Sequence, residues 1–215
     1  MLSKVFKSQW FLLAALCLLN IGIKLPFIAS NGIALDEPFS IFYSQLVPSQ
    51  LCSFLFTGDN PPLFELLLHF WIKVWGISPL SVRFLPMLYS SLTVIYVYLL
   101  GSITGSKKTG LVAGMLYTFS TFHIYFAHEA RTYSLFTLLS TASLYYYFSL
   151  DNKKGWKPLF LLVISNVLLS YCHYFGFLVI AGELFFSFFY RKGHFLFFHR
   201  VWRSFLLLLI FRMFS

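Results

Sequence analysis

The stretch WFLLAALCLLNIGIKLPF, from Trp10 to Phe27, decides the fold class of this chain. It is predominantly apolar and close to the roughly 17–25 residues that a membrane-spanning helix needs. Lys4 and Lys7 precede it, as basic residues do in a signal peptide, but the run is long and Ile28-Ala29-Ser30 is a poor cleavage site. We therefore expect a first span that is not cleaved.

Five further apolar runs follow the first one. They are Phe84–Leu100, Leu111–Ala127, Tyr133–Leu150, Leu159–Phe175 and Gly176–Tyr190. Hydrophobic residues make up 59% of the chain and charged residues 11%, against roughly 45–50% and roughly 25% in a soluble domain. The strands of a membrane β-barrel would alternate over about 10 residues, whereas these runs are continuously apolar. The sequence therefore predicts one all-α integral membrane domain over residues 1–215, a polytopic helical bundle of about six spans.

Lysine and arginine residues predict the orientation of the bundle. Eleven of the sixteen lie at the N-terminus and in the connections 101–110, 151–157 and 191–203. Because short cytoplasmic loops collect Lys and Arg, we expect a multi-pass protein of a bacterial cytoplasmic membrane with its N-terminus inside. The net charge of +9 is spread over these connections, so nucleic acid is not an expected partner. Five of the seven acids fall on the outward side: Asp36, Glu37, Asp59, Glu65 and Glu129.

One outward loop, residues 28–83, is long and contains the apolar stretch Leu63–Trp75. Within this stretch Glu65, His69 and Lys73 recur every four residues, which places them on one stripe of a helix. A charged stripe on an apolar helix is typical of a helix that lies in the membrane interface. We therefore predict interfacial helices in this loop rather than a further crossing.

The chain closes with a short apolar run, Phe205–Phe211, before Ser215. This run is far too short to cross a bilayer. We expect either a chain truncated before a seventh span or a tail that lies on the membrane.

Several outward polar residues have both a structural and a chemical interpretation. Helix capping alone would explain Asp36, and likewise Asp59 or Asn60. Contact with lipid headgroups would explain Arg131, and anchoring at the membrane interface would explain His173 between its tyrosines. Since a charge near hydrocarbon is costly and tends to be retained for a use, the same positions are the candidates for chemistry.

Five short motifs in chain order resemble one family, the polytopic glycosyltransferases of GT-C fold that use polyprenyl-phosphate sugars. Protein O-mannosyltransferases and the RgtA/B/C/D-like transferases are among its members. The motifs are Asp36-Glu37, Asn60-Pro61-Pro62-Leu63, Arg83 ahead of the second span, Glu129-Ala130-Arg131-Thr132-Tyr133 and His173-Tyr174-Phe175-Gly176. His is commoner than Asn at the position of Asn60. The resemblance covers the whole chain but only the N-terminal portion of a typical member.

The resemblance implies transfer of a sugar from a polyprenyl-phosphate donor to a lipid, glycan or protein acceptor on the outer face of the membrane. It implies that Asp36 is the catalytic base, with Glu37 as its orienter and Glu129 as a second acid. A single attack on the anomeric carbon implies inversion, by analogy with one-step glycosidases. The substrate-binding candidates are Asp59, Asn60, Lys73, Arg83, Arg131, Tyr133, His173 and Tyr174.

Three alternatives stay open from the sequence. The chain could be a catalytically inactive fragment of such an enzyme, or a polytopic transporter or scaffold, since charges in a helical bundle also mark transport pathways. Neither a resident cofactor nor a metal site is predicted, although Asp36, Glu37 and Glu129 have the oxygen ligands that a divalent cation prefers.

Overall fold

The computed structural model of the protein describes residues 2–30, 32–56, 61–152 and 156–190, and every regular element in these ranges is a helix. The chain divides into two compact units, Met1–Gly176 and Phe177–Ser215, which are described separately. Asp59, Asn60, the predicted inner connection 191–203 and the run Phe205–Phe211 lie outside the described residues. The all-α prediction is confirmed for the described part.

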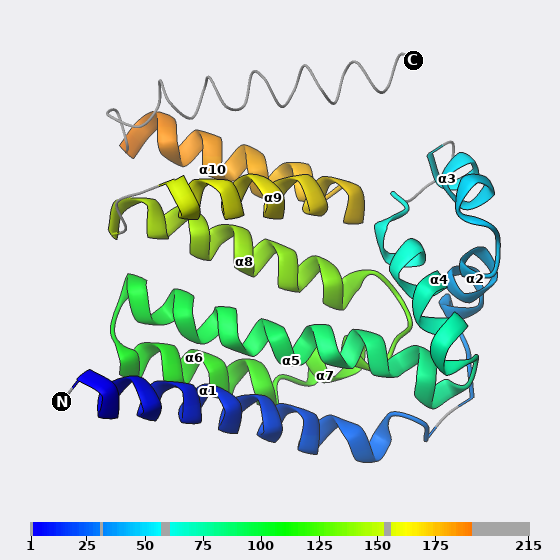
Figure 1. The fold of residues 1–215 in the computed structure, drawn as a ribbon, viewed down its shortest axis with the longest axis horizontal. Coiled ribbons are helices and arrows are strands. Elements are labelled where there is room, and N and C mark those ends of the chain that lie inside the picture. Colours follow the sequence, from blue (N-terminus) through cyan, green and yellow to red (C-terminus); the bar gives the residue numbers. More distant parts are fainter. Residues whose placement is uncertain (1, 31, 57–60, 153–155, 191–215) are drawn as a thin grey trace. The chain divides into compact units, whose positions relative to one another are not determined.

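Five long helices of the first unit lie side by side (Figure 1). Helix α5 is central, because it packs against α1, α6 and α8, while α8 in turn packs against α9. A short 3₁₀ helix, Leu25–Phe27, continues α1. The bounds are α1 Leu2–Lys24, α5 Pro79–Thr104, α6 Lys107–Phe119, α8 Tyr133–Asn152 and α9 Trp156–Cys172.

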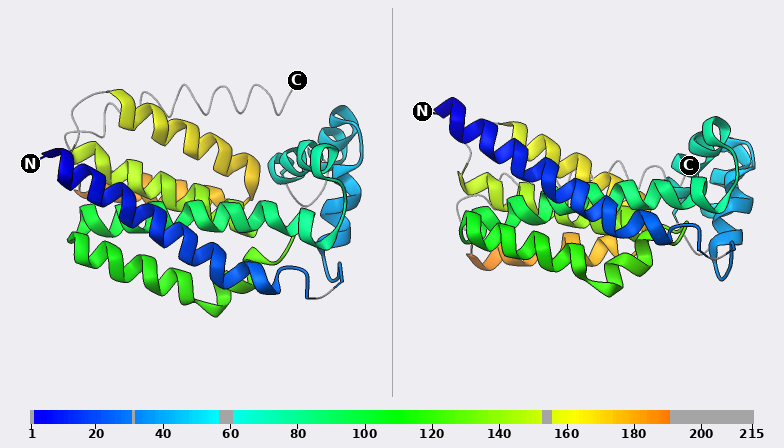
Figure 2. Two further views of the ribbon diagram at one scale, coloured as in Figure 1. Left: turned by 60° about the horizontal axis from the view of Figure 1, so that its bottom comes forward. Right: turned by 90° about the horizontal axis from the view of Figure 1, so that it is seen from below.

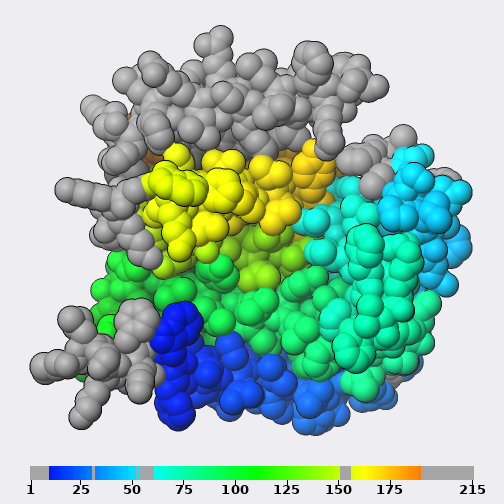
Figure 3. Space-filling view, in the orientation of Figure 1, coloured from blue at the N-terminus to red at the C-terminus, as the bar shows by residue number. Residues whose placement is uncertain are grey.

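Three further helices gather at one end of this bundle, as both views in Figure 2 show. They are α2 Glu37–Ser44, α3 Pro48–Phe56 and α4 Leu63–Trp75, so the predicted interfacial helix is present with its expected bounds. Helix α4 contacts α2, α3, α5 and α9. In the space-filling view its cyan side chains adjoin the green ones of the bundle (Figure 3). The long loop therefore folds back onto the bundle end.

Two of the differences from the predicted spans concern the start of α5 and the run Leu111–Ala127. Helix α5 begins at Pro79, because Ser78 caps it by accepting a hydrogen bond from the Ser81 N–H at 3.1 Å, so Arg83 lies inside the helix rather than ahead of it. The predicted span Leu111–Ala127 is two helices, α6 and α7 (Thr121–Ala127), separated by an extended Ser120. Ser120 is the N-cap residue of α7, but its side chain makes no capping bond, and apolarity alone did not reveal this break.

Two helical segments are long and apolar enough to cross a membrane, Trp10–Phe27 and Pro79–Thr104, and Trp156–Cys172 and Gly176–Phe189 are shorter apolar helices. Large apolar side chains such as Phe11, Leu18 and Leu116 are exposed on the outside of the bundle. A surface of this kind suits lipid better than water. The count of about six spans stays a prediction.

Polar side chains lie between the helices and bond one another. Asn20 of α1 donates to the Thr118 hydroxyl at 3.5 Å and accepts from the Ser91 hydroxyl at 3.2 Å. The buried Lys24 ammonium donates to the Ser90 hydroxyl. Side chains of this kind hold helices together where the surroundings offer no hydrophobic driving force. Polar side chains are thus buried between helices whose outer surfaces carry large apolar side chains, as expected for a bundle in lipid.

Close packing of α5 against α6 depends on glycine. A Cβ atom on Gly110 would lie 2.4 Å from the Tyr98 carbonyl oxygen, and one on Gly101 would lie 2.9 Å from the Gly110 Cα atom. Side chains at these positions would force the two helices apart. Leu13, Leu16 and Val94 complete the apolar core beside this contact, together with Tyr98 and Tyr117.

The second unit has one described helix, α10, which occupies Gly176–Tyr190, the bounds expected for the sixth predicted span.

Candidate active site

The loop between the first helix and α2 carries Asp36 on an unusual backbone. Leu35, just before it, has a positive φ of 54°, a left-handed conformation that costs a non-glycine residue on the order of 1–2 kcal/mol. Asp36 occupies the N-cap position of α2 without a side-chain capping bond, and it is exposed. Asp36 therefore has the position of a capping residue but not the capping hydrogen bond. Its carboxylate is accessible at the helix N-terminus.

The next residue, Glu37, forms a buried ion pair with Arg83 of α5. The Arg83 Nε donates to Glu37 Oε1 at 2.8 Å and its Nη2 donates to Oε2 at 2.6 Å. Glu37 is 2% exposed and Arg83 is 6% exposed. The guanidinium also donates to the carbonyl oxygens of Ile28 at 3.1 Å and Gly32 at 2.8 Å. This two-pronged geometry is the strongest that an arginine offers a carboxylate.

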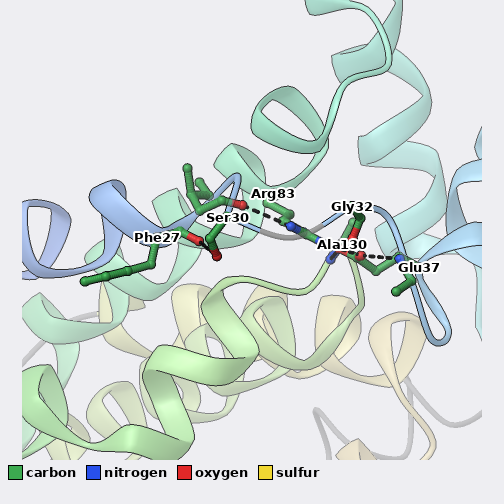
Figure 4. Close-up of polar contacts among 8 residues, drawn as sticks. Phe27, Ser30, Gly32, Glu37, Arg83 and Ala130 are labelled. Atoms are coloured by element: carbon green, nitrogen blue, oxygen red, sulfur yellow. Dashed lines mark hydrogen bonds and ion pairs between the residues drawn. The ribbon is translucent and has the colours of Figure 1, made fainter.

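Glu37 also joins two backbone segments that are distant in sequence. Its Oε2 accepts from the Ala34 N–H at 3.2 Å and its Oε1 from the Ala130 N–H at 2.9 Å. Figure 4 shows Arg83, Gly32, Glu37 and Ala130 converging at this point. Glu37 therefore fixes the loop that carries Asp36 against the connection between α7 and α8, and Arg83 is occupied in doing so.

The charge of Glu37 makes the stability of this connection depend on pH. Burial raises the pKa of Glu37, but the hydrogen bonds from Arg83, Ala130 and Ala34 outweigh it and hold the pKa below its ordinary 4.5. An acid whose pKa is depressed on folding stabilises the fold above its unfolded pKa and loses that contribution as pH falls through the folded value.

We expect the difference in unfolding free energy between the wild type and Glu37→Gln to be constant from pH 7 to pH 5.5. It should shrink as the pH falls below about 4.5. Denaturant titrations at several pH values measure this difference. A gap that widens with acidification would contradict a charged Glu37.

The connection between α7 and α8 places Arg131 against α2. The Arg131 N–H donates to the Glu129 carbonyl oxygen at 2.8 Å, which makes the link a tight turn. The guanidinium Nη1 donates to the Ser40 hydroxyl at 3.2 Å, and its carbon lies 5.4 Å from the centre of the Phe39 ring. The Glu129 carboxylate lies near the Tyr125 hydroxyl. The half-buried Arg131 is thus oriented at the same bundle end as Asp36.

A second buried polar group lies between α2 and α4. The Ser40 hydroxyl donates to Glu65 Oε1 at 2.9 Å, and the Ser44 hydroxyl donates to the Glu65 carbonyl oxygen at 3.0 Å. The His69 Nδ1 lies 2.9 Å from the Ser44 carbonyl oxygen. Glu65 and His69 stood out in the sequence as a helical stripe, but they were not predicted to be site residues, because the residues of α2 that contact them cannot be identified without the fold.

The aromatic candidates lie beside this group. The Tyr133 ring contacts His173, with ring centres 6.5 Å apart, and His173 Nδ1 accepts from the Phe175 N–H at 3.1 Å. Tyr174 is exposed. Four of the five sequence motifs therefore meet at one end of the first unit.

The remaining candidates are not brought into this cluster. Lys73 is exposed on the last turn of α4, two turns beyond Glu65, while Asp59 and Asn60 lie outside the described residues. Within the part of the chain that the structure describes, no three His, Cys, Asp or Glu side chains gather as metal ligands, so Asp36, Glu37 and Glu129 do not form a cation site there.

An open groove of about 420 Å³ lies elsewhere, where α6 ends. Met115, Leu116, Phe119, Ser120 and Thr121 line it, and none of the predicted site residues is among them.

Apolar helices, hydrogen-bonded polar side chains between them and a charged cluster at one bundle end together indicate a membrane protein with a polar site at one end of its helices. The chain belongs to the dolichyl-phosphate-mannose-protein mannosyltransferase family, whose model matches residues 59–215. The GT-C resemblance drawn from the short motifs is thereby confirmed.

One curated relative is an uncharacterized protein of Aquifex aeolicus (strain VF5). It is 30% identical over 130 residues, which is 60% of this chain and 26% of that protein. The chain thus spans about a quarter of the length of this relative. No solved structure matches.

Proposed function

We propose that the protein transfers a sugar from a polyprenyl-phosphate donor to a hydroxyl group of an acceptor on the outer face of a bacterial cytoplasmic membrane. The observation that carries the proposal is the meeting of an accessible carboxylate, Asp36, and an oriented guanidinium, Arg131, at one bundle end of a chain from this family. The family's description supports a lipid-linked sugar as donor.

The proposed reaction needs few groups. The acceptor oxygen forms a bond to the anomeric carbon as the bond from that carbon to the phosphate oxygen breaks. The acceptor's proton goes to the Asp36 carboxylate, and the electron pair of the broken bond leaves with the polyprenyl phosphate. Because the phosphate is already a good leaving group, no strong general acid is required, and one displacement inverts the anomeric carbon.

Each proposed role follows from the contacts around the residue. Asp36 lies at the N-terminus of α2, where its exposed carboxylate makes no capping bond and is open to an acceptor. The two Nη atoms of Arg131 have hydrogens beyond the one given to Ser40, and these suit phosphate oxygens. Since Arg83 is occupied by Glu37, we assign it the positioning of the Asp36 loop rather than phosphate binding. Glu129 is the acid that helps to place the acceptor.

The experiment is turnover of a polyprenyl-phosphate mannose by the purified full chain in detergent, followed as free polyprenyl phosphate and as glycosylated acceptor. Arg131→Gln should lower kcat/KM about 10–100-fold, because a charge-assisted contact contributes about 1.5–3 kcal/mol. Arg131→Lys should recover part of the loss, since it keeps the charge but not the planar fork. The matched control is Lys108→Gln, which removes a positive charge in the first turn of α6.

Two results would contradict this proposal. Equal kcat/KM values for wild type and Arg131→Gln would remove Arg131 from phosphate recognition. Absence of turnover by the wild type, beside an active full-length relative under the same conditions, would overturn the transferase proposal for this chain and favour the inactive alternative.

A further inference from the structure

Three buried polar atoms between α2, α4 and the α7–α8 connection are not used by the reaction proposed above. They are Glu65 Oε2, His69 Nε2 and Arg131 Nε, and none has a hydrogen-bond partner among the described residues. Glu65 is 2% exposed and His69 is 3% exposed. Buried polar groups in folded proteins are nearly always satisfied by protein, water or ligand. Three unsatisfied atoms on neighbouring side chains therefore point to a bound polar partner.

The hydrogen bond of His69 defines what its other nitrogen can do. The Nδ1 atom lies 2.9 Å from the Ser44 carbonyl oxygen, which can only accept, so Nδ1 carries the hydrogen. In the neutral ring Nε2 then has a free lone pair and is an acceptor. This nitrogen is buried without a partner.

The Ser40 hydroxyl defines the state of the other two side chains. It accepts from Arg131 Nη1 at 3.2 Å and donates to Glu65 Oε1 at 2.9 Å. These two bonds hold the carboxylate and the guanidinium in place and leave Glu65 Oε2 and Arg131 Nε directed elsewhere. The group thus offers two acceptors and one N–H donor.

Only a limited class of ligand fits this set. A phosphate would face the Glu65 carboxylate and the bare His69 nitrogen, which repel an anion, and an apolar group would leave all three atoms unsatisfied. A hydroxyl group both donates and accepts, so it can bond to acceptors of Glu65 and His69 and to the donor of Arg131.

The group lies close to the proposed reaction centre. Ser40 is one turn beyond Asp36 on the same helix, about 6 Å along its axis. Phe39, between them in sequence, has the Arg131 guanidinium carbon 5.4 Å from its ring centre. We infer that Glu65 Oε2, His69 Nε2 and Arg131 Nε form a subsite that binds hydroxyl groups of the transferred sugar. This inference rests on the proposed function and adds to it the residues that recognise the sugar.

The test compares two affinities for the purified full chain in detergent. One is for bare polyprenyl phosphate, and the other is for polyprenyl phosphates that carry mannose, glucose or galactose. The affinity for the tightest-binding sugar-bearing lipid is divided by the affinity for bare polyprenyl phosphate. This ratio measures the contribution of the sugar to binding. We expect His69→Asn to lower this ratio about tenfold, because a change of this size corresponds to the loss of one buried hydrogen bond. Asn keeps the N–H that reaches the Ser44 carbonyl and lacks Nε2.

Glu65→Gln provides an independent variant, because it replaces one carboxylate oxygen by an NH₂ group and keeps the side-chain size. We expect a similar fall in the ratio, with the affinity for bare polyprenyl phosphate unchanged. Val74→Ala, which is exposed on the same helix, is the matched control and should leave both affinities unaltered. Thermal unfolding of each variant shows that the fold is retained.

The outcomes separate the subsite from the proposed function. Ratios equal to the wild type in both variants, as expected if water alone fills these positions, would overturn the subsite. A wild type that binds bare polyprenyl phosphate and gains nothing from any sugar would overturn the subsite and leave phosphate recognition standing. A wild type that binds none of these lipids would overturn both.

Discussion

Glu37→Gln is expected to lower the free energy of unfolding by about 3–5 kcal/mol, because it leaves the Arg83 guanidinium charged and buried without its carboxylate. The substitution also weakens the acceptor for the Ala34 and Ala130 N–H groups. A reversible denaturant titration in mixed detergent micelles measures the change.

Asp36→Asn is the matched control, since it makes a similar carboxylate-to-amide change one residue away at an exposed position. It should alter stability by about 1 kcal/mol or less. The double variant Glu37→Gln with Arg83→Gln should cost at least about 1 kcal/mol less than the sum of the single variants, because the two side chains are coupled. Additive values would show that the ion pair contributes little and would contradict its proposed role in fixing the loop.

Asp36→Asn is expected to lower the rate of sugar transfer by about 10²–10⁴-fold, the usual contribution of a general base. The amide cannot take the acceptor's proton, yet it has nearly the same size and the same place at the start of α2. Initial rates with saturating polyprenyl-phosphate mannose should therefore fall in kcat, with the affinity for the donor nearly unchanged.

Asp151→Asn is the control for this activity measurement, because it makes the same chemical change at the far end of α8 from the Arg131 connection. It should transfer sugar at the wild-type rate. Equal rates for wild type and Asp36→Asn would exclude Asp36 as the base. Asp36→Asn is thus expected to lower the transfer rate with little change in stability. Glu37→Gln is expected to lower the free energy of unfolding.

The helices could be predicted from the sequence to differing degrees. The apolar run at Gly176–Tyr190 and the striped helix Leu63–Trp75 have the bounds that their patterns predict. The run Leu111–Ala127 was wrongly predicted as one element, because apolar residues recur throughout it and the interruption lies in the extended backbone of Ser120. The hydrophobicity of a run indicates whether its helix lies in lipid or in water. It indicates only weakly where the helix is interrupted.

The candidate site shows the same division. Motif resemblance selected Asp36, Glu37, Arg83, Glu129, Arg131 and His173, and the structure brings them to one bundle end. Their contacts were not predictable, because Glu37 and Arg83 are 46 positions apart in sequence and Glu37 and Ala130 are 93 apart. Glu37 was expected to orient Asp36 as a neighbour, whereas in the structure its carboxylate bonds to Arg83 and to backbone N–H groups.

The sequence by itself determined the class of this protein, which is an all-helical chain with long apolar helices from the family that its short motifs indicated. The physical reason is that apolar length and the distribution of Lys and Arg are properties of local sequence. Only the tertiary structure decided which charges are buried in an ion pair, which stay accessible, and that Glu65 and His69 direct unpartnered atoms beside Arg131. These properties depend on long-range packing, which assigns each polar atom its partner.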